Sequence, residues 1–185
     1  MSTLYASLRT LGLTLCLLGA SQAAASPSVF LESGGFFSAG YSAGPSFRLG
    51  GEVVVPAPFV DASLGLEALV APGSAGGSWQ TRLWVSSLIL PAVGTTPPLA
   101  VGAGADLGFG ANGLRAHVGP LVGTDLLFTL DLPMTLSLYL APGYSAASGV
   151  SLAWAAQLRY YLENLAFELE STDLQLFNAG IRFLF

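Results

Sequence analysis

Hydrophobic and polar residues alternate along most of this chain, and the alternation breaks at clusters of glycine, proline, serine and asparagine. Because side chains of a β-strand point alternately to opposite faces, this pattern predicts strands separated by turns. No amphipathic helical window competes with it. We predict ten strands, with eight as the alternative if the first is short or the last hairpin is misassigned. The ten ranges are 28–37, 46–55, 59–71, 78–90, 98–110, 114–128, 134–144, 150–161, 165–171 and 174–185.

Ionisable residues within one predicted strand are separated by even numbers of positions. Since a strand has a period of two, each strand confines these residues to one face. The other face is apolar, as Leu64 and Leu66 are beside Glu67. The even spacings occur in the pairs Arg48 with Glu52, Asp61 with Glu67, Glu168 with Glu170, Arg115 with His117 and His117 with Asp125.

Composition decides which face meets water. The chain is 52% hydrophobic and 9% charged, with a mean hydropathy of +0.65, whereas soluble domains carry about 25% charged residues. So few charges cannot cover the outside of a soluble protein, but they can fill the inside of a barrel. An arginine facing lipid near mid-membrane would cost about 2 to 4 kcal/mol, and only closure satisfies every strand edge in lipid. The predicted fold is therefore all-β, a closed antiparallel transmembrane β-barrel. A soluble periplasmic lipid-binding barrel with its polar face outward is the alternative.

Residues 1–25 have the three parts of a secretory signal peptide. Arg9 lies in the charged start, residues 11–20 form the apolar run, and Ala23 and Ala25 give a small-residue cleavage site. We predict cleavage there, leaving residues 26–185 as one barrel domain. Cys16 is the only cysteine, so the mature chain would have no disulfide, thiol nucleophile or cysteine metal site. Lysine is absent and the net charge is −5, which excludes the basic surface that nucleic-acid binding needs.

The chain ends in NAGIRFLF, residues 178–185. This ending resembles the carboxy-terminal signature of bacterial outer-membrane β-barrels, with polar Asn178, then Gly180, aromatic Phe183 and terminal Phe185. In size and plan the chain is similar to the small OmpA/OmpX-type barrels. In that family the barrel-assembly machinery reads the last strand, which pairs with the first strand to close the wall. The resemblance implies a bacterial outer-membrane location, contact with outer-membrane lipid, and an assembly signal formed by these four residues.

Aromatic residues gather near both predicted rims, as in the interfacial belts of membrane barrels. One predicted belt contains Phe37, Phe47, Trp79 and Phe109, and the other contains Phe59, Phe128, Tyr160 and Phe185.

The inward-facing ionisable residues should pair with one another, because buried charges need partners. The predicted lumen network consists of Glu32, Arg48, Glu52, Asp61, Glu67, Arg82, Asp106, Arg115, His117, Asp125, Arg159, Glu168, Glu170 and Arg182. We expect it to fill the lumen, in a protein with a structural or envelope-stabilising role. The alternative is a narrow cation-preferring passive pore, since acids exceed arginines by three in this set. Five small residues leave space for a passage unless Trp84 or Tyr139 fills it: Ala100, Gly102, Gly104, Gly108 and Gly110.

The single histidine is the only candidate catalytic base. His117 with Asp106 or Asp125 would give a base and an orienting carboxylate. Outer-membrane lipid deacylases of similar size carry a serine two residues after the histidine, and here that position is Gly119. We therefore expect no enzymatic activity and assign no catalytic residue. With one histidine and no cysteine in the predicted mature chain we expect no metal site and no cofactor.

Overall fold

The computed structural model describes residues 27–41, 44–56, 61–72, 78–90, 99–111, 113–173 and 175–185. The predicted signal peptide lies outside this range. Ten strands and one short helix make up the described chain. Their bounds are β1 (Gly34–Tyr41), β2 (Pro45–Val55), β3 (Asp61–Ala71), β4 (Ser78–Leu90), β5 (Leu99–Gly110), β6 (Arg115–Asp125), α2 (Leu127–Leu130), β7 (Met134–Ser145), β8 (Gly149–Leu162), β9 (Leu165–Thr172) and β10 (Phe177–Leu184).

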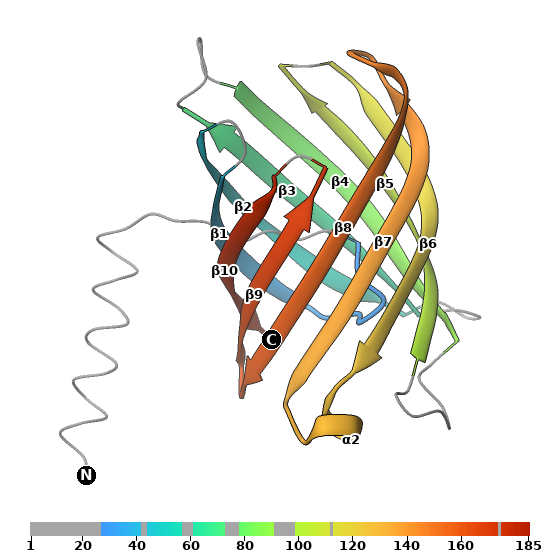
Figure 1. The fold of residues 1–185 in the computed structure, drawn as a ribbon, viewed down its shortest axis with the longest axis vertical. Coiled ribbons are helices and arrows are strands. Elements are labelled where there is room, and N and C mark those ends of the chain that lie inside the picture. Colours follow the sequence, from blue (N-terminus) through green and yellow to red (C-terminus); the bar gives the residue numbers. More distant parts are fainter. Residues whose placement is uncertain are drawn as a thin grey trace, which may run out of the picture.

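The strands form one closed antiparallel barrel, which confirms the predicted all-β barrel architecture and the choice of ten strands (Figure 1). Around the wall the order is β1-β10-β9-β8-β7-β6-β5-β4-β3-β2, and β1 lies against β2. The first and last strands pair from Gly34 with Leu184 to Tyr41 with Phe177. We name the end that carries α2, where β1 begins and β10 ends, the lower end, and the opposite end the upper end, as they lie in Figure 1.

The predicted first strand, 28–37, is wrong. The strand is β1, and the residues before it run as an irregular segment. Val29, Phe30 and Leu31 belong to this segment. Their apolar side chains lie inside the barrel, so they are in apolar surroundings although their backbone is not part of the wall. The sixth strand was predicted to reach residue 128, but β6 ends at Asp125 and the chain turns through α2. In the described ranges no helix is long and apolar enough to cross a membrane.

The two faces of the wall differ in polarity. Leucine and valine side chains cover the outer face, including Leu136, Leu138 and Leu140 on β7. Arginine and carboxylate side chains on the strands turn inward and are buried. Among the described residues, exposed charged residues are confined to turns and one strand start: Asp61, Asp131, Glu163 and Asp173.

Exposed aromatic side chains mark both rims of the outer face. At the upper rim Tyr41 pairs with Phe177, and at the lower rim Tyr160 pairs with Phe167. Phe37 was predicted at a rim, but it pairs with Ile181 in the middle of β1. Phe59 and the side chain of Phe128 lie outside the described part of the chain. The exposed rim aromatics are Tyr41, Trp79, Phe109, Tyr144 and Phe177 above, and Tyr160, Phe167, Phe183 and Phe185 below.

Candidate functional site

Polar side chains gather in the lumen of the barrel, and the charged ones among them form two ion-pair networks. Alternation along the strands turns arginine and carboxylate residues inward, where neighbouring strands bring them together. The upper network runs through Glu170, Arg48, Glu67, Arg82, Asp106, Arg115 and Asp173. The lower network runs through Glu32, Arg159, Glu168, Arg182 and Glu52.

In the upper network each guanidinium group bridges two carboxylates. Arg48 Nη1 lies 3.1 Å from a Glu170 oxygen and 3.7 Å from a Glu67 oxygen. Arg82 lies 3.5 Å from Glu67 and 3.3 Å from Asp106. The third cation, Arg115, lies 3.8 Å from Asp106 and 2.8 Å from Asp173, a partner at the β9–β10 turn that the sequence did not indicate. Four carboxylates and three guanidinium groups leave one negative charge in excess.

The lower network repeats this arrangement with shorter contacts. Glu168 Oε1 accepts hydrogen bonds from Arg159 Nε at 2.6 Å and from Arg182 Nε at 2.8 Å. Arg182 also donates to Glu52 at 3.0 Å, and Arg159 to Glu32 at 3.1 Å. Three carboxylates and two guanidinium groups again leave one excess negative charge. Removal of one partner from such a buried pair leaves an uncompensated charge, which costs about 3 to 5 kcal/mol.

Aromatic rings occupy the lumen beside these networks. Phe36 and Trp84 pack with ring centroids 6.0 Å apart, and the Arg182 guanidinium lies 5.2 Å from the centre of the Phe36 ring. Gly65 makes room for the indole ring, because a Cβ atom there would lie 2.0 Å from Trp84. Trp84 therefore fills the lumen over a glycine of the neighbouring strand instead of lying on the outer face.

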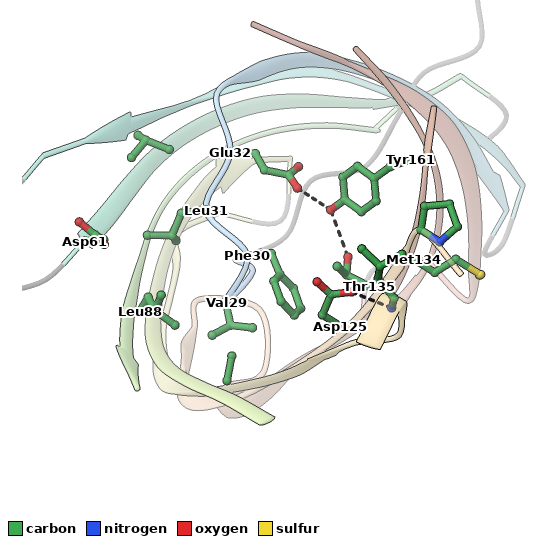
Figure 2. Close-up of a pocket in the computed structure, with 14 residues that line it drawn as sticks. Val29, Phe30, Leu31, Glu32, Asp61, Leu88, Asp125, Met134, Thr135 and Tyr161 are labelled. Carbon is green, nitrogen blue, oxygen red and sulfur yellow. Dashed lines mark hydrogen bonds between the residues drawn. The ribbon is translucent and has the colours of Figure 1, made fainter. Parts of the chain in front are cut away.

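Residues 27–33 form an N-terminal segment that runs inside the barrel (Figure 2). Val29 is buried against Ala100, Leu121 and Tyr139, and Ser28 N donates to Ser86 Oγ at 3.2 Å. At the lower end Glu32 pairs with Arg159 and accepts a hydrogen bond from the Tyr161 hydroxyl group. The segment is thus attached to the wall by apolar packing at its start and by an ion pair at its end.

Other parts of the chain lie against the small residues of β5 inside the barrel. A Cβ atom at Gly104 would lie 2.9 Å from Pro27, and one at Gly102 would lie 3.3 Å from Val29. At Gly108 it would lie 2.7 Å from the stem of Arg115. Tyr139 also packs against Gly104, as one reading of the sequence allowed. The N-terminal segment, Tyr139 and Arg115 therefore occupy the space that these small residues provide.

A cavity of about 700 Å³ remains at the lower end, between the N-terminal segment and the wall (Figure 2). Apolar side chains such as Phe30, Leu88 and Met134 line it, with Glu32, Thr135 and Tyr161 on one side. The Thr135 and Tyr161 hydroxyl groups lie 3.1 Å apart. We call this cavity the lower vestibule.

Two predicted network residues, Asp61 and Asp125, lie outside both networks. Asp61 is exposed at the start of β3, and Asp125 accepts a hydrogen bond from Leu127 N at 2.9 Å, at the start of α2. Among the described residues neither forms an ion pair. Asp125 is at the opposite end of β6 from His117, so it does not orient that imidazole. Glu32 is a member of the lower network, but it belongs to the N-terminal segment and not to a strand. The remaining predicted members lie in the two networks, apart from His117, whose ring lies 3.5 Å from Asp106.

The predicted assembly-signal residues alternate along β10 and its end. Asn178 is buried inside and Gly180 shares its face, whereas Phe183 and Phe185 are exposed outside. Phe185 N donates to Ser33 O at 3.1 Å, so the chain end is fixed next to the start of β1.

Sequence reasoning missed one polar contact of His117. Its Nε2 atom lies 2.8 Å from Ser151 Oγ on β8. No spacing in the sequence indicates this pair, because the two residues are 34 positions apart and meet only through the register of three strands. In the ranges that the structure describes, no cluster of three or more histidine, cysteine or acidic residues is arranged to hold a metal ion.

Comparison with protein-family models, with curated proteins and with solved structures finds no match to this chain.

Proposed function

We propose that this protein is an integral β-barrel of the bacterial outer membrane with a structural, envelope-stabilising role and a closed lumen. The observation that carries the proposal is the inversion of polarity: ion pairs fill the inside, and leucine, valine and aromatic side chains cover the outside. Soluble monomers rarely expose such continuous apolar surface. A bilayer accepts it, and a closed barrel leaves no unpaired strand edge in lipid.

The two aromatic rims support a membrane-spanning position. Val150, which pairs with Tyr144 of the upper rim, precedes Tyr160 of the lower rim by ten residues on β8. At a rise of about 3.4 Å per residue and a tilt of about 45° this separation is about 24 Å in height, close to the apolar band of about 25 Å in outer-membrane barrels. An even number of strands puts the start of β1 and the end of β10 on one side, which we assign to the periplasm.

The filled lumen favours a structural role over transport. Two ion-pair networks, the Phe36 and Trp84 rings and the N-terminal segment all lie across the path of a solute. The lower vestibule and the two excess negative charges favour a narrow cation-preferring pore as the second candidate. Expected partners are outer-membrane lipid and, during biogenesis, the barrel-assembly machinery.

Cell fractionation and planar-bilayer recording test the proposal together. The protein should remain with the outer membrane until detergent is added, and its gel mobility should change on boiling, as it does for folded barrels. Purified protein in planar bilayers should show no conductance steps. Recovery in the soluble periplasmic fraction would overturn the membrane position, and steady cation-selective steps would favour the pore over the structural role.

A further inference from the structure

Three side chains of serine-hydrolase type lie in one transverse row at the upper end of the lumen. Asp106 on β5 and His117 on β6 are direct cross-strand partners. The row continues from His117 to Gly143 on β7 and from Gly143 to Ser151 on β8. Four neighbouring strands thus place a carboxylate, an imidazole, a glycine without a side chain and a hydroxyl group at the same level.

Gly143 is what allows the imidazole to reach the hydroxyl group. A Cβ atom at this position would lie 2.6 Å from His117 Cδ2. The ring therefore crosses β7 directly over the glycine, and its Nε2 atom lies 2.8 Å from Ser151 Oγ. On the other side of the ring, Nδ1 lies 3.5 Å from Asp106 Oδ2.

The carboxylate is held in place independently of the histidine. Tyr139 donates a hydrogen bond to Asp106 Oδ1 at 3.1 Å, and Arg82 Nε lies 3.3 Å from Asp106 Oδ2. Within the described chain Nδ1 of His117 has no hydrogen-bond partner, and Asp106 is the acid that it faces. A proton on Nδ1 directed at Asp106 leaves Nε2 free to accept the Ser151 proton, which is the tautomer that nucleophilic catalysis requires.

We propose that Ser151, His117 and Asp106 form a catalytic triad, and that this barrel is a serine esterase for carboxylic esters of amphipathic molecules at the upper membrane interface. Gly119, two residues after the histidine, does not have to supply the nucleophile, because Ser151 on β8 does. This activity goes beyond the structural role and uses residues outside the lower network.

The reaction follows from the three positions. Ser151 Oγ attacks the ester carbonyl carbon while His117 Nε2 takes the hydroxyl proton, and the tetrahedral intermediate then breaks the bond to the alcohol oxygen. The alcohol leaves with the proton from Nε2. Water then attacks the acyl-serine, giving its proton to Nε2, and collapse releases the carboxylic acid and returns the proton to Ser151.

The wall leaves Ser151 accessible from the side. Residue pairing of β8 with β9 ends at Ala155 and Thr172, and one further hydrogen bond joins Asp173 N to Trp154 O. Residues 149–153 therefore project beyond the β9–β10 hairpin, and the upper part of Figure 1 shows β8 extending past β9. Ser151 is only half-buried, and the surface beside this notch is apolar, with Val150, Leu176 and Phe177 exposed. A molecule whose chain lies in the outer leaflet can therefore bring an ester group to the hydroxyl group.

The same projection provides a candidate oxyanion donor. Asp173 N donates to Trp154 O, so the Trp154 backbone groups point towards β9. Residues two apart in a strand direct their backbone groups to the same side. The N–H group of Leu152, next to the nucleophile, therefore points into the notch beyond the last β8–β9 residue pair. In α/β-hydrolases a backbone N–H immediately after the serine binds the oxyanion.

The test uses the full mature protein folded in detergent micelles, with a fluorophosphonate probe and the dodecanoate ester of p-nitrophenol. We expect a covalent adduct on the peptide that contains Ser151, and release of p-nitrophenol. Ser151→Ala should abolish both, and His117→Gln should lower both by about 100-fold or more. Ser145→Ala is the matched control, since Ser145 is a half-buried serine of the same rim whose hydroxyl group accepts a hydrogen bond from Ala147 N.

Heat-dependent gel mobility verifies that each variant is folded. Absence of any adduct on the folded wild-type protein would overturn the triad, as would labelling that survives Ser151→Ala or that is lost equally in Ser145→Ala. An adduct with cleavage of the water-soluble butyrate ester but not of the micellar dodecanoate would overturn lateral access from lipid. Because conductance is measured separately, failure of the esterase leaves the structural role to its own test.

Discussion

Gly65 and Trp84 are direct partners across β3 and β4, and the indole ring occupies the space that a side chain at position 65 would fill. A Cβ atom at Gly65 would lie 2.0 Å from Trp84 Cζ2. We predict that Gly65→Ala displaces the ring from Phe36 and destabilises the barrel by about 1 to 3 kcal/mol, the range for overpacking. Urea unfolding in lipid vesicles, followed by tryptophan fluorescence, measures this. Gly35→Ala is the control, because its nearest contact would be 3.9 Å away, and equal stability of the two variants would contradict the packing argument.

The lower network should be sensitive to loss of one cation. Arg182 is fully buried between Glu52 and Glu168, so Arg182→Met leaves two carboxylates short of a partner. We expect a loss of about 3 to 5 kcal/mol in the free energy of unfolding. Adding Glu52→Gln should restore part of the lost free energy, because it removes one of the two carboxylates that lack their partner. Asp131→Asn, at an exposed turn, should change stability by less than about 0.5 kcal/mol; no recovery in the double variant would argue against direct coupling.

In the upper network, the contribution of a single hydroxyl group can be tested. Tyr139→Phe keeps the ring but removes the donor to Asp106 Oδ1, which lies 3.1 Å away in a buried site. The expected loss is about 1 to 3 kcal/mol, the cost of leaving a buried charged acceptor with one partner fewer. Urea midpoints of wild type and variant measure it. Tyr160→Phe on the exposed lower rim should leave the midpoint unchanged, and an equal effect there would point to a general role of tyrosine.

The fold could be predicted because strand alternation is local. Even spacing, as between Glu168 and Glu170, fixes which side chains share a face without knowledge of any partner strand. Pairing is not local. The Arg115 contact with Asp173 and the His117 contact with Ser151 depend on register across several strands, which no spacing in the sequence reveals.

The predicted first strand differs from the structure for another reason. Val29, Phe30 and Leu31 look like part of a strand because they are apolar, but the structure buries them in the lumen against β5. A hydrophobic run signals burial without saying whether the buried backbone belongs to the wall. The small residues of β5 were therefore read as a possible passage when they accommodate a segment from the same chain.

Burial of that segment can be measured with single cysteines, because the predicted mature chain has none of its own. Val29→Cys should react with a charged methanethiosulfonate about tenfold or more slowly than Val150→Cys, since labelling at the buried site requires local opening. Val29 is 1% exposed and Val150 is 90% exposed. Reaction rates in folded protein, compared with those in urea, give the protection. Equal rates at both positions would show that the segment spends its time outside the lumen.

Removal of the segment should partly open the barrel. Deletion of residues 27–31 clears the space beside Ala100, Gly102 and Gly104 while keeping Glu32 to pair with Arg159. The remaining networks still carry more carboxylates than guanidinium groups, so any current should prefer cations. We expect wild type to be closed and the deletion variant to show small cation-selective steps in planar bilayers. Leu31→Ala, which shortens one side chain of the segment, is the control and should remain closed. A deletion variant as silent as wild type would place the barrier in the ion-pair networks and the Trp84 ring alone.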